Sequence, residues 1–298
     1  MVPPITWPTV ARIANVVTPA GPRVPRAAAA ATVERLRRAA DWTTPVLSEL
    51  SRMPEEARVV GAIPPLVVDR RGLVVVSARI AGDFLGSDEP PAGPGAWGRT
   101  VVGRRGPVGL LGAVVAVRAL APHATGVWDP FDSRRILVAA NVLEAAEGAA
   151  LDQNDFCRWT ALRAGLWGVM FVRAPWLRDH LGHLARQLPD TLTEFTNLVL
   201  VLDGVVDAWM GALTPQEIPS VGWIRRNAPE QAGVAGLRGL RLAGMAVEGI
   251  EEARAGAAAF SEVVVAAGGV PTLLCSRDHL PTRDEVAHPG AWTARVGL

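Results

Sequence analysis

Apolar residues recur every three or four positions over several long stretches of the chain, which is the pattern of helices that bury one face. Between residues 25 and 42, Val33, Leu36 and Ala40 follow this spacing, and arginines take many of the outer positions. The alanine-rich composition of this stretch also favours a helix. The same reasoning predicts long helices over residues 154–172, 175–188 and 192–213, and one or two more over 236–269, ended by Gly268 and Gly269.

Strand patterns are fewer and shorter. Residues 66–80 contain two β-branched runs on either side of the tetrapeptide Asp69-Arg70-Arg71-Gly72, which predicts two strands joined by a hairpin turn. Residues 136–140 form a short apolar run typical of a buried strand. Asp129, Pro130 and Phe131 directly precede that run and predict a turn.

Three further segments complete the pattern. Residues 86–98 are dense in proline and glycine and predict a loop, a mobile one. Residues 106–122 predict a buried helix closed by Pro122, and residues 280–296 predict a turn and a short final helix.

From these elements we expect a mainly α-helical fold with a small β component. Without a repeat or a linker, we expect one domain over residues 1–298, with N-terminal helices and a hairpin in 1–125 and further helices in 126–298.

Composition removes several kinds of chemistry. All 30 basic residues are arginine, and the chain has no lysine and no tyrosine. This excludes a Schiff-base lysine, a lysine-containing phosphate loop and a tyrosine acid. A net charge of +1 gives no field that would attract nucleic acid, so we expect no such partner. The arginine doublets at 37–38, 70–71, 104–105, 134–135 and 225–226 are scattered, and we expect solvated surface positions there rather than anion sites.

Cysteine content and hydropathy bear on location. Cys157 and Cys275 are the only cysteines, which is typical of a reducing compartment. Prolines and Arg12 interrupt the N-terminal stretch where a signal peptide needs an apolar core. Apolar runs near residues 110–121 and 198–210 are broken by charged residues before reaching membrane-spanning length. We expect a cytoplasmic protein without a membrane partner.

The predicted helix over 154–172 has the spacing of a metal-binding helix without its ligands. Residues 163 and 167 lie four apart, so their side chains share one helix face, with residue 164 beside them. In an HExxH motif these three positions hold two zinc-binding histidines and a catalytic glutamate. Here they hold Arg163, Ala164 and Trp167.

The sequence around this helix resembles a family of bacterial zincin-like proteins described as zinc metallopeptidases or hydrolases. In that family, the counterpart of residues 135–181 carries a tryptophan, three residues, HExxH and then a Val-Pro-Trp-Leu-Arg-Asp-His-Leu run. The tryptophan corresponds to Trp159 and the run to residues 174–181. Further counterparts are the stretches "RIANVVTPAGP", "VVDRRG", "WDPF", "LVLDGVVDAWM" and "LPTRDEVAHPGAWTARV". The resemblance implies a zincin-like helical fold; one branch of the family is described as associated with biosynthesis of coenzyme F-420.

The departures from the family pattern fall on its metal ligands. Both histidines and the glutamate of HExxH are replaced, and the family's Leu-Glu-Gly-His-Ala stretch is Leu-Asp-Gly-Val-Val here, with Asp203 and Val205 at the two polar positions. Catalytic zinc needs about three protein ligands and an open position. The resemblance therefore implies a degenerate site without a cofactor.

We hypothesise that side chains of the protein itself take the place of the metal ion. The guanidinium of Arg163 would lie near the position of the lost ion and offset the charge of Asp203 or Asp207. Trp167 would fill the volume of the missing metal, water and imidazole. The other interpretation is that Arg163 points to solvent, as arginines usually do.

Other residues offer weaker sites. His180 and His183 share a helix face near Asp179 and Glu194, which allows a relocated metal site. Cys157 beside Arg158 is either an activated thiolate or a packed small side chain. The chain has no GxSxG nucleophile elbow, and His123, His279 and His288 lie in turn-like contexts, so nothing indicates a Ser-His-Asp triad.

Three accounts of function remain open at this stage. The first is a pseudoenzyme that binds a protein or a small acidic ligand and supports or regulates a process such as coenzyme F-420 biosynthesis. The second is a working hydrolase with a site rebuilt around His180, His183 and Asp203. The third is a purely structural subunit, whose sign would be an exposed apolar patch.

Overall fold

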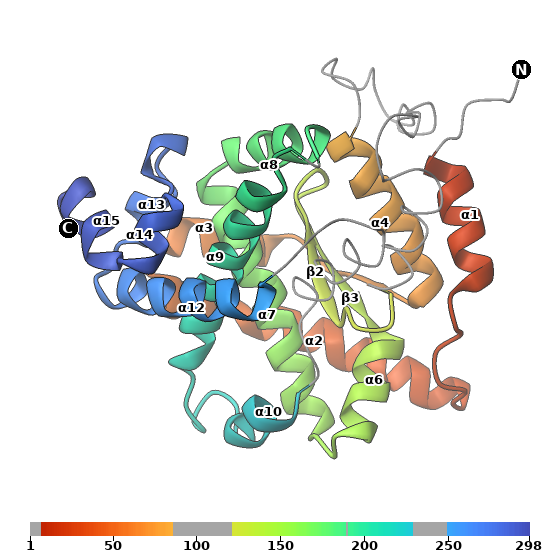
Figure 1. Ribbon diagram of the computed structural model, residues 1–298. Helices are drawn as coiled ribbons and strands as arrows, with labels where there is room; N and C mark the ends of the chain where they lie inside the picture. Colours follow the sequence, from red (N-terminus) through yellow and green to blue (C-terminus); the bar gives the residue numbers. More distant parts are fainter. Residues whose placement is uncertain (1–6, 86–120, 189, 229–248) are drawn as a thin grey trace, which may run out of the picture.

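The computed structural model describes residues 7–85, 121–188, 190–228 and 249–298, and within them the protein is mainly helical with one small sheet, as predicted (Figure 1). The α-helices are α1 (Trp7–Val17), α2 (Arg26–Ser51), α3 (Pro54–Ala62), α4 (Arg70–Leu85), α6 (Ala139–Gly148), α7 (Gln153–Arg173), α8 (Trp176–Arg186), α9 (Leu192–Gly211), α10 (Val221–Asn227), α12 (Ile250–Ala266), α13 (Val270–Leu273), α14 (Arg283–Ala287) and α15 (Pro289–Val296). A 3₁₀ turn, η2, spans Arg277–His279.

The sheet has three strands in the order β1-β3-β2. Strand β1 (Leu66–Val68) lies parallel to β3 (Arg134–Val138), and β2 (Gly126–Asp129) pairs antiparallel with β3. The turn between β2 and β3 is the one predicted at residues 129–131, and Asp129 stabilises it by accepting the backbone N–H groups of Phe131 (3.0 Å) and Asp132 (3.2 Å). The predicted strand over 136–140 corresponds to β3, which begins two residues earlier and ends at Val138.

The predicted hairpin over residues 66–80 is wrong. Only its first run is a strand, β1, whereas the second run lies in helix α4. The Asp69 side chain accepts the backbone N–H of Gly72 (2.7 Å), as an N-terminal helix cap does. Beyond this cap, Leu73, Val74 and Ala78 recur at helical spacing and are fully buried, so tertiary packing outweighs the β preference of the valines.

The other predicted helices that fall within the described residues are present with shifted ends. The helix expected between residues 25 and 42 continues through Pro45 as α2, and the tail forms two short helices, α14 and α15, instead of one. The expected helices over 154–172, 175–188 and 192–213 correspond to α7, α8 and α9. Of the stretch 236–269, only the end is described, as α12, and the loop over 86–98 and most of the helix over 106–122 lie outside the described residues.

Helix α7 runs through the middle of the protein and is buried on nearly all sides (Figure 1). Its N-terminus is capped by Asp152, whose side chain accepts the N–H groups of Asn154 and Asp155 (both 2.9 Å). Two glycines allow close neighbours: a Cβ on Gly165 would lie 3.0 Å from Leu47 of α2, and one on Gly168 would lie 2.6 Å from Trp128 of β2. Helix α7 is thus held between α2 and the sheet.

Helix α9 lies against another side of α7 and packs along α12 (Figure 1). The contact with α12 is close because Gly204 faces Ser261, whose hydroxyl donates to the carbonyl of Val201 (3.1 Å). The far end of α9 is stabilised by Arg225, which donates to the carbonyls of Met210, Gly211 and Leu213 (2.7–2.9 Å). A cation at a helix C-terminus is favourable because it compensates the unpaired carbonyls there.

Among the arginine doublets that the structure describes, two contain a buried member, Arg70 and Arg135, contrary to the expectation of surface positions. Arg70 donates to Asn141 (2.5 Å) and to the carbonyl of Ala20 (3.3 Å), and it pairs with Glu144. Arg135 is 1% exposed and donates to the carbonyl of Ala40 (3.2 Å) and the hydroxyl of Thr43 (2.6 Å). Burial lowers the pKa of Arg135 to about 10. Both arginines act as structural links between distant segments.

Within the described ranges, no helix has the length and apolar character to cross a membrane.

Beside the sheet, Arg79 lies within ion-pair distance of three carboxylates. Arg79 of α4 contacts the fully buried Asp129, Asp132 at 2.9 Å and Asp83 at 3.9 Å. Burial raises the pKa of Asp83 to about 6; Arg79 opposes this, whereas Asp129 and Asp132 add to it. The folded protein therefore binds a proton at Asp83 more tightly than the unfolded chain does.

We predict a pH-dependent contribution of Asp83 to stability. Because its folded pKa is raised, this contribution is present below pH 4 and is lost as pH rises through about 6. Asp83→Asn removes the ionisable carboxyl group, so this stability is no longer lost as pH rises. The free energy of unfolding of the variant at pH 7 is expected to exceed that of the wild type by about 1–3 kcal/mol. Urea unfolding from pH 4 to 7 measures this, with Asp190→Asn, an exposed carboxylate, as the matched control; identical pH profiles for wild type and Asp83→Asn would refute it.

Candidate functional site

The helices α7 and α9 bring together the polar residues singled out in the sequence. From α7, the guanidinium of Arg163 donates to the carboxylate of Asp203 on α9 at 2.5 Å. Its other terminal nitrogen donates to Asp207, one turn further along α9. Asp203 and Asp207 are four residues apart and share one face, so a single planar guanidinium reaches both. We call these three residues the arginine cluster.

Burial distinguishes this cluster from a surface ion pair. Arg163 is 7% exposed and Asp203 is 4% exposed, whereas the side chain of Asp207 is 43% exposed. The interpretation that Arg163 points to solvent is therefore wrong. The cluster begins inside the helix interface and ends at the surface, so one of its two carboxylates keeps contact with water.

Charge in the cluster follows from burial and pairing together. Burial raises the pKa of Asp203, and the Arg163 guanidinium partly offsets that rise. Burial also opposes the charged form of Arg163, but the carboxylates of Asp203 and Asp207 outweigh it and raise the pKa of Arg163. Arg163 thus stays protonated and supplies a fixed positive charge between the helices.

Trp167 lies one turn after Arg163 but remains partly exposed. It packs against the main core and stacks on Phe171, with ring centroids 6.4 Å apart. Its described ring contact is therefore within α7 rather than across to α9. The filling of a vacated metal position by Trp167 stays a hypothesis.

Ala164 and Val205 lie on other faces of their helices. A Cβ added at Gly126 of β2 would lie 3.3 Å from the Cβ of Ala164, so Ala164 faces the sheet. Val205 is fully buried, and two residues along a helix correspond to a rotation of about 200° from Asp203. On α9, the position that faces α7 is therefore 203 and not 205.

The donor set does not fit zinc. At the three positions that correspond to HExxH stand a guanidinium, a methyl group and an indole, none of which binds zinc, and the nearby carboxylates already accept from Arg163. Among the described residues, no three His, Cys, Asp or Glu side chains form a group suited to a metal ion. The chain's residues thus offer fewer ligands here than catalytic zinc requires.

His180 and His183 lie on α8 and do not join the cluster. His183 is exposed, and His180 is half-buried with its ring 6.1 Å from that of Trp176. Burial and the nearby Arg277 lower the pKa of His180. Since Asp203 is engaged by Arg163, the grouping of His180, His183 and Asp203 into a rebuilt site has no support from the geometry.

Cys157 is buried, and His279 and His288 contact residues close by in the chain. The thiol of Cys157 lies among core side chains, and this burial raises its pKa to about 12, which favours the packed small side chain over the activated thiolate. Cys275 is exposed. The ring of His279 contacts the hydroxyl of Ser276 (2.8 Å), three residues away, which is a local turn contact, and the ring of His288 contacts the carbonyl of Asp284 (3.1 Å).

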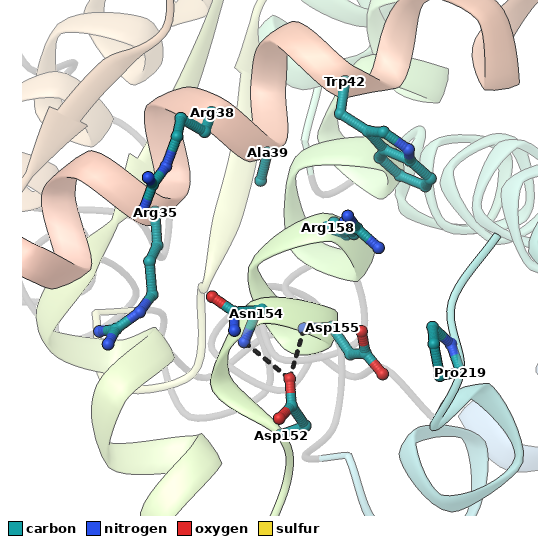
Figure 2. A pocket seen from close by; sticks show the side chains of 9 residues that line it. All are labelled: Arg35, Arg38, Ala39, Trp42, Asp152, Asn154, Asp155, Arg158 and Pro219. Carbon is teal, nitrogen blue, oxygen red and sulfur yellow. Dashed lines mark hydrogen bonds between the residues drawn. The ribbon is translucent and has the colours of Figure 1, made fainter.

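Sequence analysis missed a separate cavity at the N-terminal end of α7 (Figure 2). Its volume is about 600 Å³, and it lies between α2, the first turns of α7 and the segment before α10. The lining residues are Arg35, Arg38, Ala39, Trp42, Asp152, Asn154, Asp155, Arg158 and Pro219. The spacing of Arg35, Arg38 and Trp42 on one helix face was the available signal, but Arg158 joins them only through the fold.

Comparison with known proteins supports part of the expected relationship. Residues 101–198 match the model of a family described as zincin-like metallopeptidases, which is about a third of the chain. The match includes α7 with Arg163 and Trp167 and ends before Asp203. No curated protein sequence matches this chain.

One solved structure is similar over almost the whole length. It is the crystal structure of a protein described as a "putative hydrolase with a novel fold" from Chloroflexus aurantiacus, with a TM-score of 0.67 and 19% sequence identity. The alignment covers 98% of this chain and 99% of that one. The two chains therefore share a fold, and the central third of this chain is similar to zincin-like metallopeptidases.

Proposed function

We propose that this protein is a catalytically inactive relative of the zincin-like metallopeptidases, in which the arginine cluster stands where the relatives hold a metal ion. The observation that carries the proposal is the contact of the Arg163 guanidinium with Asp203 and Asp207 between α7 and α9. The match of residues 101–198 to the zincin-like family supports the placement of HExxH on α7.

The electrostatics support the same proposal. A divalent cation between two helices neutralises carboxylates and joins the helices, and a protonated guanidinium supplies both effects with one positive charge and directed N–H donors. A guanidinium does not polarise a water molecule into a nucleophile as zinc does. The helix pair is thus retained while hydrolysis is lost.

For the biological role, we propose a supporting or regulatory factor linked to coenzyme F-420 biosynthesis. Its support is the resemblance of the sequence to that branch of the family. Deletion of the gene in its host is expected to lower the cellular content of the coenzyme, measured by fluorescence of extracts. Unchanged content in the deletion strain would refute this role and leave the proposal of inactivity standing.

We predict that the purified protein binds no stoichiometric zinc. Elemental analysis after incubation with zinc and desalting should give less than about 0.1 zinc per chain, because about three ligands are needed. Addition of 1,10-phenanthroline should leave the melting temperature unchanged. One zinc per chain, lost on chelation together with a hydrolytic activity, would favour the working hydrolase with a rebuilt site.

Restoring the ligands gives the matched gain-of-function test. The variant Arg163→His, Ala164→Glu, Trp167→His and Asp203→Glu places two imidazoles on one face of α7 opposite a carboxylate on α9, and it is expected to bind about one zinc per chain. The control carries Arg163→Ala in place of Arg163→His, together with the other three changes. It therefore offers zinc only two ligands. A folded variant, verified by circular dichroism, that takes up no more zinc than its control would contradict the placement of HExxH.

The arginine cluster also predicts coupled stability effects. Arg163→Ala and Asp203→Ala should each lower the free energy of unfolding by about 3 kcal/mol or more, because each leaves a buried charge short of partners. The double variant should lose at least about 1 kcal/mol less than the sum. The control is Arg173→Ala, which removes a partly exposed pair of the same helix (Arg173 to Glu56, 3.5 Å) and should cost about 1 kcal/mol or less. Additive effects in urea unfolding would argue against coupling.

A further inference from the structure

The cavity at the N-terminal end of α7 has the dimensions of a small-molecule site. Its volume of about 600 Å³ lies within the range of about 300–1,000 Å³ that is usual for ligand pockets. Arg35 and Arg38 project from α2 on one side, and Asp152, Asn154 and Asp155 lie at the start of α7 (Figure 2). It lies at the opposite end of α7 from Trp167 and does not include the arginine cluster.

The arginines of the cavity are available for a ligand. Within the described part of the chain, neither Arg35 nor Arg38 has a carboxylate within ion-pair distance. Arg158 lies over the ring of Trp42, with its guanidinium carbon 5.0 Å from the ring centroid. Arg35 and Arg38 thus line the same cavity as the stacked pair of Trp42 and Arg158.

The carboxylates in the cavity are already committed to the protein. Asp152 accepts the backbone N–H groups of Asn154 and Asp155 at the start of α7. Asp155 accepts both the backbone N–H and the hydroxyl of Ser220 (2.8 and 2.7 Å). The lining therefore combines three arginines (Arg35, Arg38 and Arg158) with two aspartates that already accept hydrogen bonds from the protein, which leaves a formal excess of one positive charge.

We propose that this cavity binds a small organic anion that carries a flat ring and a phosphate or carboxylate group. Arg35 and Arg38 hold the anionic group, because a guanidinium matches the oxygens of phosphate and carboxylate in pairs. The ring lies against the Trp42 surface, where stacking on an indole and a guanidinium is favourable. Such a site would bind its ligand without a metal ion. Ligand binding can therefore be tested independently of the proposed function.

Isothermal titration calorimetry with four probes tests the ligand class. AMP supplies a ring and a phosphate, benzene-1,3,5-tricarboxylate supplies a ring and carboxylates, and adenosine and inorganic phosphate each supply one part only. We expect at least one of the two ring-bearing anions to bind once per chain with a Kd below about 1 mM, and adenosine and phosphate to bind at least about tenfold more weakly. The preference between AMP and the tricarboxylate identifies the anionic group.

Variants on α2 test the location. Arg35→Gln with Arg38→Gln should weaken binding of the preferred anion at least about tenfold, since two charge-assisted contacts are lost. The control pair Arg26→Gln with Arg37→Gln removes the same charge from exposed positions of the same helix outside the cavity, and should change Kd by less than about twofold. The proposal is overturned if neither ring-bearing anion binds at about 5 mM, if adenosine or phosphate binds equally well, or if the control pair weakens binding as much.

Discussion

The structure depends most on a buried positive charge between two helices. Arg163 lies inside the interface of α7 and α9, where a guanidinium without partners would be strongly unfavourable. Asp203 and Asp207 supply those partners from one face of α9. Because Asp203 and Asp207 are four residues apart, they lie on one face of α9, and their pairing with Arg163 keeps that face toward α7. The neighbouring Gly204 faces α12, where the absence of a side chain allows close contact with Ser261.

The same constraint underlies the proposed relationship to the zincin-like metallopeptidases. A helix that is buried on nearly all sides cannot simply lose a charged group from its polar face, since the carboxylates opposite would remain unpaired. In the proposed account, an arginine in place of a metal ion would keep the helices joined and preserve the fold that the chain shares with the structure from Chloroflexus aurantiacus. The proposal is that the scaffold persists without the catalytic chemistry.

The sequence predicted what local patterns determine and missed what only the tertiary structure creates. The helices α7, α8 and α9 were predictable because apolar residues repeat over many turns. The second strand of the expected hairpin was not, because Asp69 caps a helix whose buried face is made of residues that prefer strands. Spacing and family resemblance suggested the pair of Arg163 with Asp203 or Asp207, whereas the burial of Arg70 and Arg135 and the cavity around Trp42 arise from segments far apart in the chain.

The central claim is that an arginine occupies the place of a metal ion between α7 and α9. The most direct measurement is an X-ray structure of crystals grown with excess zinc, with anomalous scattering recorded at the zinc edge. The account predicts continuous density from the Arg163 guanidinium to both carboxylates and no anomalous peak between the helices. A zinc peak bound to Asp203, with the Arg163 side chain turned away, would contradict it.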